Sequence, residues 1–127
     1  MKILAIDYGT QRVGLAISRG TLAEPLAVVE NDEHLFEHLK SIVESEKIEQ
    51  IVLGISEGEM ADLTREFAQE LEEIVTVPIE FVDETLTSHE VAQRLKDRGV
   101  KGISQKPIDH YAAALILEEW LGQTSTR

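Results

Sequence analysis

The feature that most constrains the fold is a pair of apolar segments near the N-terminus, separated by a short turn. The first runs from Ile3 to Asp7 and ends in a carboxylate, and the second runs from Val13 to Ser18. This spacing predicts a central strand, a tight turn and an antiparallel return strand. Asp7 is then held at a strand end with Gly9 nearby, which is a suitable place to meet a metal ion or a phosphate.

The rest of the chain alternates between strand and helix patterns. Further strands are predicted at residues 26–29, after Pro25, and at 51–54 and 79–82. Helices are predicted at about 32–47, where Asn31 or Asp32 is the cap, and at 57–74, 88–98 and 107–121. This order predicts an α/β fold in which three antiparallel N-terminal strands and two parallel strands form a mixed sheet with helices on both faces. We expect one domain over residues 1–122 and a flexible tail at 123–127.

Composition limits the possible class of protein. The 127 residues fit one domain, and a hydrophobic share of 43% is enough for a packed core. The absence of cysteine excludes disulfides and thiol catalysis. No stretch approaches the roughly 18 apolar residues of a membrane span, and the first residues lack the pattern of a secretory signal. We therefore expect a cytoplasmic protein that makes no contact with a membrane.

The net charge of −12 at first argues against a nucleic-acid partner, because phosphate binding relies on lysine and arginine. The distribution of charge weakens that objection. Five of the 12 basic residues lie in one short stretch, at Arg94, Lys96, Arg98, Lys101 and Lys106. Many acids fall instead on the predicted helices at 32–47 and 57–74, where they are expected on solvated faces.

Several carboxylates stand at the ends of predicted elements. Asp7 ends the first strand, Asp83 and Glu84 end the last strand, and Asp109 lies near the start of the final helix. Ligand sites in open α/β sheets gather at the carboxyl ends of strands, and clustered carboxylates suit Mg²⁺ or Mn²⁺. An equally common explanation for each acid is a local role in a cap or a turn.

Three segments together resemble a known family. Ile6 to Ala16, Val82 to Thr87 and Asp109 to Leu117 are similar, in order and spacing, to the motifs of the YqgF/RuvX proteins. The resemblance implies a ribonuclease H-like fold with a three-acid metal site. Asp7, Glu84 and Asp109 match its positions and are the expected catalytic residues and ligands of Mg²⁺ or Mn²⁺.

The resemblance also implies an activity. The family is described as Holliday-junction-resolvase-like and as a nuclease that matures the 5′ end of pre-16S rRNA. It implies a hydrolase with a two-metal mechanism, acting on pre-rRNA or branched DNA and associated with ribosomal precursor particles, as a monomer or a homodimer. Thr85 and the short acidic segment 55–60 depart from the family pattern in a direction that weakens phosphate attraction.

Phosphate-binding residues are expected on both sides of this site. Gly9 and Thr10 would let the backbone approach a phosphate, because glycine has no side chain to obstruct it. Arg12, Lys101 and Lys106 are the expected contacts to the nucleic-acid backbone, although ordinary surface positions explain them about equally well.

Two other functions stay open at this point. Asp-x-Gly-Thr also opens the phosphate loop of the actin-like kinases and ATPases, so the chain could be a nucleotide-binding module. The acidic charge also fits a non-catalytic ribosome-assembly factor. Nuclease assays and calorimetry with ATP separate these alternatives from a metal-dependent nuclease.

Overall fold

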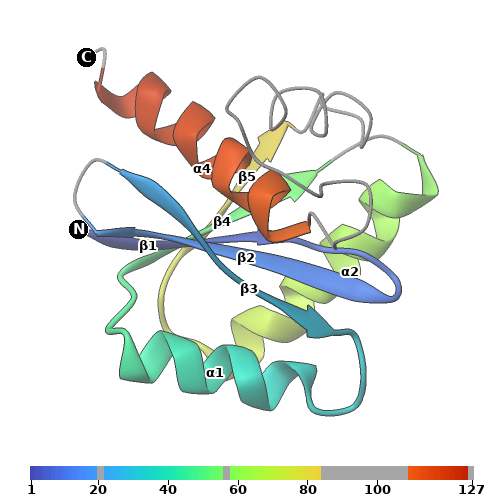
Figure 1. Ribbon diagram of the computed structural model, residues 1–127. Helices are drawn as coiled ribbons and strands as arrows, with labels where there is room; N and C mark the ends of the chain where they lie inside the picture. Colours follow the sequence, from blue (N-terminus) through green and yellow to red (C-terminus); the bar gives the residue numbers. More distant parts are fainter. Residues whose placement is uncertain (20–21, 56–57, 84–108, 126–127) are drawn as a thin grey trace, which may run out of the picture.

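The computed structural model describes residues 1–19, 22–55, 58–83 and 109–125, and these form a sheet with helices on both faces (Figure 1). The strands are β1 (Lys2–Asp7), β2 (Arg12–Arg19), β3 (Ala23–Glu30), β4 (Gln50–Ile55) and β5 (Ile79–Asp83). They lie in the order β3-β2-β1-β4-β5. The pairs β1–β2 and β2–β3 are antiparallel, whereas β1–β4 and β4–β5 are parallel, so the predicted mixed sheet is confirmed.

Three helices are described: α1 (Leu35–Ser45), α2 (Glu59–Ile74) and α4 (Asp109–Ser125). Helices α1 and α2 cover one face of the sheet, and α4 crosses the other (Figure 1). Helix α4 continues to Ser125, past its predicted end near Leu121 and into the segment expected to be a tail. The helix predicted at 88–98 and the basic loop after it lie outside the described residues.

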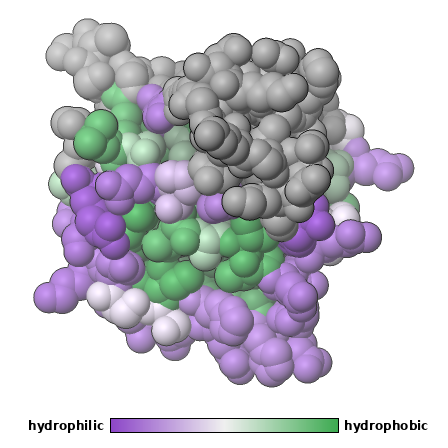
Figure 2. All heavy atoms as spheres, in the orientation of Figure 1, coloured by the Kyte–Doolittle hydropathy of each residue, from purple (hydrophilic) through white to green (hydrophobic). Residues whose placement is uncertain are grey.

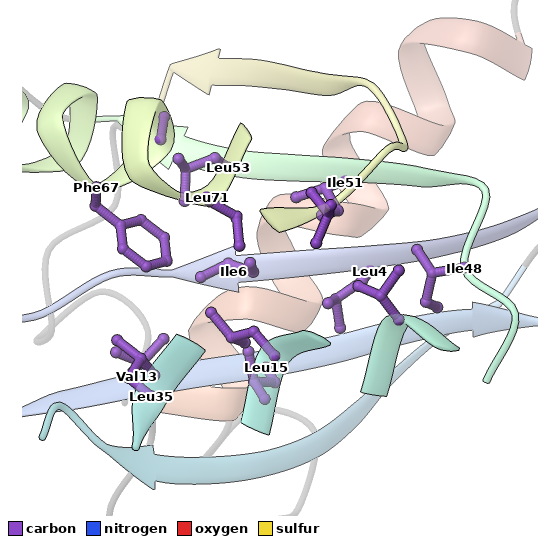
Figure 3. Packing of buried hydrophobic residues seen from close by; sticks show 14 of the residues in the cluster. Leu4, Ile6, Val13, Leu15, Leu35, Ile48, Ile51, Leu53, Phe67 and Leu71 are labelled. Atoms are coloured by element: carbon purple, nitrogen blue, oxygen red, sulfur yellow. The ribbon is translucent and has the colours of Figure 1, made fainter. Parts of the chain in front are cut away.

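The core consists of two apolar layers, one on each face of the sheet. Leu4 and Ile6 of β1 point into the larger layer, against α1 and α2 (Figure 3). Ile3 and Ala5 of the same strand point into the smaller layer, against α4. Because successive strand residues alternate between faces, β1 separates the two layers and lies at the centre of the protein. The same alternation determines toward which face of the sheet the last residue of β1, Asp7, is directed.

The buried face of helix α2 differs from the one that its apolar spacing favours. Its pattern predicts that Leu63 faces inward with Phe67 and Leu71, but Leu63 is 38% exposed. Thr64 is buried instead, at 2% exposure, and its Oγ1 donates to the backbone carbonyl of Met60 over 2.7 Å. The hydroxyl is satisfied within its own helix, so the small side chain can face the sheet without an unpaired polar atom.

Strand β3 is longer than predicted and includes Pro25. It forms an edge of the sheet, and Pro25 pairs with Ala16 where the register with β2 shifts. Proline cannot donate to a strand ladder and is tolerated at edges and bulges, which explains why the strand continues through it.

The acidic residues of α1 and α2 form a hydrophilic outer surface. Glu37, Glu44, Glu66 and Glu70 are all exposed, as expected for solvated helix faces. In Figure 2 the region occupied by α1, at the bottom of the view, is hydrophilic, while hydrophobic residues gather nearer the centre. Among the described residues, no helix is both long and apolar enough to cross a membrane.

Candidate functional site

Asp7 is the last residue of β1 and pairs with Gly14 of β2. Its side chain is half-buried. Ile3 and Ala5 face α4, so the alternation of the strand directs Asp7 to the same face. The carboxylate is therefore placed at the carboxyl end of the central strand, on the side of the sheet that α4 covers.

The direction of α4 brings its first turn toward this end of the sheet. Trp120, in the second half of the helix, donates its indole N–H to Glu80 near the start of β5 over 2.9 Å. Glu80 is in register with Val52, and Val52 with Ala5, so this contact lies two strand residues behind Asp7. The helix runs back over the sheet, and Asp109 begins it on the side where β1 ends (Figure 1).

Strand β5 ends at Asp83, and its alternation shows which face of the sheet Asp83 serves. Val82 belongs to the layer against α4, whereas Ile79 packs against the layer beneath α1 and α2. Asp83 has the parity of Ile79 and is directed to the face opposite Asp7. Asp83 is therefore unsuited to share a ligand with Asp7. Glu84 lies outside the described residues.

The turn between β1 and β2 is closed tightly around Gly9. A Cβ atom at this position would lie 2.5 Å from the backbone carbonyl oxygen of Arg12, closer than real side chains come. Asn31, between β3 and α1, donates its Nδ2–H to the carbonyl oxygen of Gly9 over 2.8 Å. The preceding Tyr8 stacks on Phe67 of α2, with ring centroids 4.4 Å apart. The turn is thus held from both sides.

The structure brings together four of the predicted site residues. Asp7, Gly9, Thr10 and Arg12 share the β1–β2 connection, and Thr10 and Arg12 are exposed there. Lys101 and Lys106 lie outside the described residues, as does the side chain of Asp109. No group of three His, Cys, Asp or Glu side chains gathers as metal ligands within the described part of the chain. The roles of Glu84, Asp109 and the two lysines stay predictions.

Sequence reasoning missed Asn31. Its position before a helix marks it as a candidate cap, yet the helix begins later, and Asp32 Oδ1 accepts the N–H of His34 over 2.9 Å. The contact of Asn31 with Gly9 joins positions 22 residues apart. No local pattern in the sequence could have revealed it.

Comparison with known proteins decides the family. The family model described as "RuvX: Holliday junction resolvase" matches residues 1–123. The chain belongs to this family. A protein of Maridesulfovibrio salexigens named "Putative pre-16S rRNA nuclease" is 41% identical, over 97% of this chain and 99% of its own. A protein of the same name from Sulfurihydrogenibium is 36% identical, and the match covers 98% of this chain and 92% of that protein.

Solved structures support the fold of this RuvX-family chain. Thermus thermophilus RuvC in complex with a Holliday junction substrate aligns with a TM-score of 0.67 and 14% identity, covering 99% of this chain and 96% of that one. Fowlpox virus resolvase with Holliday junction DNA aligns with a TM-score of 0.63 and 12% identity, and the alignment covers 98% of this chain and 99% of the resolvase chain. The ribonuclease H-like fold is confirmed. The family assignment also supports the predicted enzyme class, a nuclease that hydrolyses phosphodiester bonds, and such nucleases generally depend on divalent metal.

Proposed function

We propose that this RuvX-family nuclease matures the 5′ end of pre-16S rRNA in the cytoplasm, with Asp7, Glu84 and Asp109 holding Mg²⁺ or Mn²⁺. The observation that carries the proposal is the position of Asp7. Its half-buried carboxylate ends the central strand on the face of α4, and α4 itself begins with Asp109 on the same side. An acid that only braced a turn would not need this convergence of elements.

Glu84 is assigned because it matches the acidic position of the family motif, and strand parity argues against Asp83. Val82 faces α4 with Asp7, whereas Asp83 has the opposite parity. Strands β1 and β5 flank β4, so their backbones are separated by two strand spacings, about 10 Å. Divalent cations held by Asp7 and a second carboxylate would supply the chemistry of phosphodiester hydrolysis.

The donor chemistry fits a hard divalent cation. Carboxylate oxygens are the ligands that Mg²⁺ and Mn²⁺ prefer. Such ions lower the pKa of bound water and stabilise the charge that develops on the leaving oxygen. Asp7 is held by its pairing with Gly14 in the β1–β2 ladder, and the β1–β4 ladder continues to the preceding residue, Ile6, so Asp7 needs little reorganisation.

Substrate binding is assigned to the β1–β2 turn and to the basic segment. Residues 84–108 contain five basic and three acidic residues, while the rest of the chain is strongly acidic. Arg12, Lys101 and Lys106, with the backbone at Gly9 and Thr10, would contact phosphates and so position the nucleic acid without reading its sequence. Relatives named as pre-16S rRNA nucleases favour precursor rRNA, in ribosomal precursor particles, over branched DNA.

A cleavage assay with two matched acid variants tests the proposal. Purified protein is incubated with a transcript that spans the 5′ end of the precursor rRNA, and separately with a four-way DNA junction, in Mg²⁺ or Mn²⁺. Asp7→Asn should reduce the cleavage rate at least about 100-fold while the circular dichroism spectrum is unchanged, because a ligand of the cation is lost. Asp83→Asn makes the same chemical change on the opposite face and should keep wild-type activity.

Four results would each contradict a part of the proposal. Full activity in Asp7→Asn would remove Asp7 from the reaction. A wild-type protein that binds rRNA but cleaves no substrate in any divalent metal would favour an assembly factor, and tight ATP binding without cleavage would favour a nucleotide-binding module. Cleavage of the four-way DNA junction alone would support the nuclease activity but show that the substrate is branched DNA and not precursor rRNA.

A further inference from the structure

Asn31 is the residue that ties the β1–β2 turn to the remainder of the sheet. Its side-chain Nδ2–H donates to the carbonyl oxygen of Gly9 over 2.8 Å, and its backbone N–H donates to the carbonyl oxygen of Gln11 over 3.0 Å. The side chain is half-buried. One residue therefore holds two carbonyl groups of the turn that follows Asp7.

The hydrogen bond from the Asn31 side chain restricts the backbone conformation of Gly9. The close approach of the Arg12 carbonyl requires glycine at position 9. Glycine is also the residue whose backbone reorients most easily, so a turn built on it can rotate its peptide groups at little cost. The hydrogen bond from Asn31 fixes one of those peptide groups in a single orientation.

The orientation of that peptide decides where the N–H of Thr10 points. The carbonyl of Gly9 and the N–H of Thr10 belong to the same planar peptide unit, and in a trans peptide they point in opposite directions. The described residues contain no cis peptide bond. Since the carbonyl of Gly9 is directed at Asn31, the N–H of Thr10 is directed away from it, and Thr10 is exposed.

We propose that Asn31 is a positioning residue, which holds the N–H of Thr10 toward a backbone phosphate of the bound nucleic acid. The inference rests on the proposed nuclease function and extends it to a residue that no motif marks. A backbone N–H that donates to a phosphate oxygen forms a charge-assisted hydrogen bond, and turns with oriented N–H groups are suited to anions. The contact holds the strand without reading its bases.

Steady-state kinetics of Asn31→Ala test this role. The variant should raise KM for the RNA substrate about tenfold, because a charge-assisted contact that is made equally in the ground and transition states is weakened. Its kcat should change less than about twofold, because Asp7 stays in place through its pairing with Gly14 of β2. The matched control is Asp32→Ala, which removes the neighbouring side-chain hydrogen bond to His34 and leaves the turn intact. Its KM should not rise, since the contacts of Asn31 with the turn remain and the variant also loses a negative charge that would repel phosphate.

A second measurement does not depend on turnover. A short RNA oligonucleotide is titrated without divalent metal into ¹⁵N-labelled wild-type, Asn31→Ala and Asp32→Ala proteins, and amide resonances are followed by NMR. The Thr10 amide should shift in wild-type and Asp32→Ala proteins. In Asn31→Ala the shift should be much smaller, while the amides of β4 keep their positions and show that the fold is intact.

The proposal is overturned by an unchanged KM in folded Asn31→Ala, or by a Thr10 amide that shifts as in the wild type. A fall in kcat with unchanged KM would also overturn it, because Asn31 would then act through Asp7. An equal rise of KM in Asp32→Ala would assign the effect to local stability. A wild-type protein that does not cleave refutes the proposed function, whereas the NMR titration still decides the role of Asn31.

Discussion

Trp120 of α4 donates its indole N–H to the carboxylate of Glu80 on β5, over 2.9 Å. The ring packs against the apolar layer between α4 and the sheet, so the contact fixes the helix along its length. Glu80 lies level with Ala5, two residues before Asp7, and α4 begins on the side of the sheet where β1 ends (Figure 1). A hydrogen bond far from the candidate metal site thus helps determine where Asp109 begins its helix.

Trp120→Phe should lower the free energy of unfolding by about 1 kcal/mol. Phenylalanine keeps most of the apolar contact but removes the indole N–H that donates to Glu80, and a hydrogen bond at this partly exposed place is worth about that much. Trp120 is the only tryptophan, so unfolding in urea is followed by circular dichroism and not by fluorescence. Glu80→Gln keeps an acceptor oxygen and should lose less stability. An equal or larger loss in that control would contradict the assignment.

Gly9→Ala should destabilise the protein by about 2 kcal/mol, because the new methyl group would collide with the Arg12 carbonyl and force the backbone to shift. The midpoint of urea unfolding measures this change. Thr10→Ala, at the next and exposed position of the turn, should change stability by less than about 0.5 kcal/mol. If both variants lost the same stability, the turn would be generally sensitive and the steric explanation would be wrong.

The sequence predicted the sheet well because its strands are short apolar runs between clear turn signals. Ile3 to Asp7 and Ile51 to Gly54 read as buried strands and form the centre of the sheet. Errors arose where tertiary packing chose between similar side chains, as when Thr64 took the buried position expected for Leu63.

The candidate site was predictable only in part. Asp7 was identifiable because it directly follows an apolar strand, stands beside Gly9 and matches an acidic position of the family motif. The choice between Asp83 and Glu84 came from family resemblance, and strand parity now supplies a physical reason against Asp83. Asn31 could not be predicted, since its partner Gly9 is distant in sequence and is contacted through a backbone oxygen.

Divalent metal should stabilise the wild-type protein through Asp7. At a concentration about 100 times its dissociation constant, Mn²⁺ adds about 2.7 kcal/mol to the free energy of unfolding. Thermal unfolding with Mn²⁺, with Mg²⁺ and after addition of EDTA measures the effect. Asp7→Asn should show little or no shift of Tm with metal, whereas Asp83→Asn should shift like the wild type. A full metal-induced shift in Asp7→Asn would place the cation elsewhere.

The end of α1 offers a prediction in the opposite direction, a gain of stability. Lys47 has a positive φ of 55°, a conformation that residues with a side chain adopt at a cost. The N–H of Ile48 donates to the carbonyl of Val43 over 3.0 Å, and the N–H of Lys47 to that of Glu44 over 3.3 Å, so the helix closes in a turn that usually carries glycine. Lys47→Gly should therefore raise the free energy of unfolding by up to about 1 kcal/mol.

Lys40→Gly is the matched control, because Lys40 is an exposed residue inside the same helix. It removes the same side chain and the same charge, but glycine within a helix should cost about 1 kcal/mol. Urea unfolding of both variants at equal salt separates the effect of backbone conformation from that of charge. If both substitutions changed stability in the same direction, the loss of a lysine, and not the left-handed backbone at position 47, would explain the result.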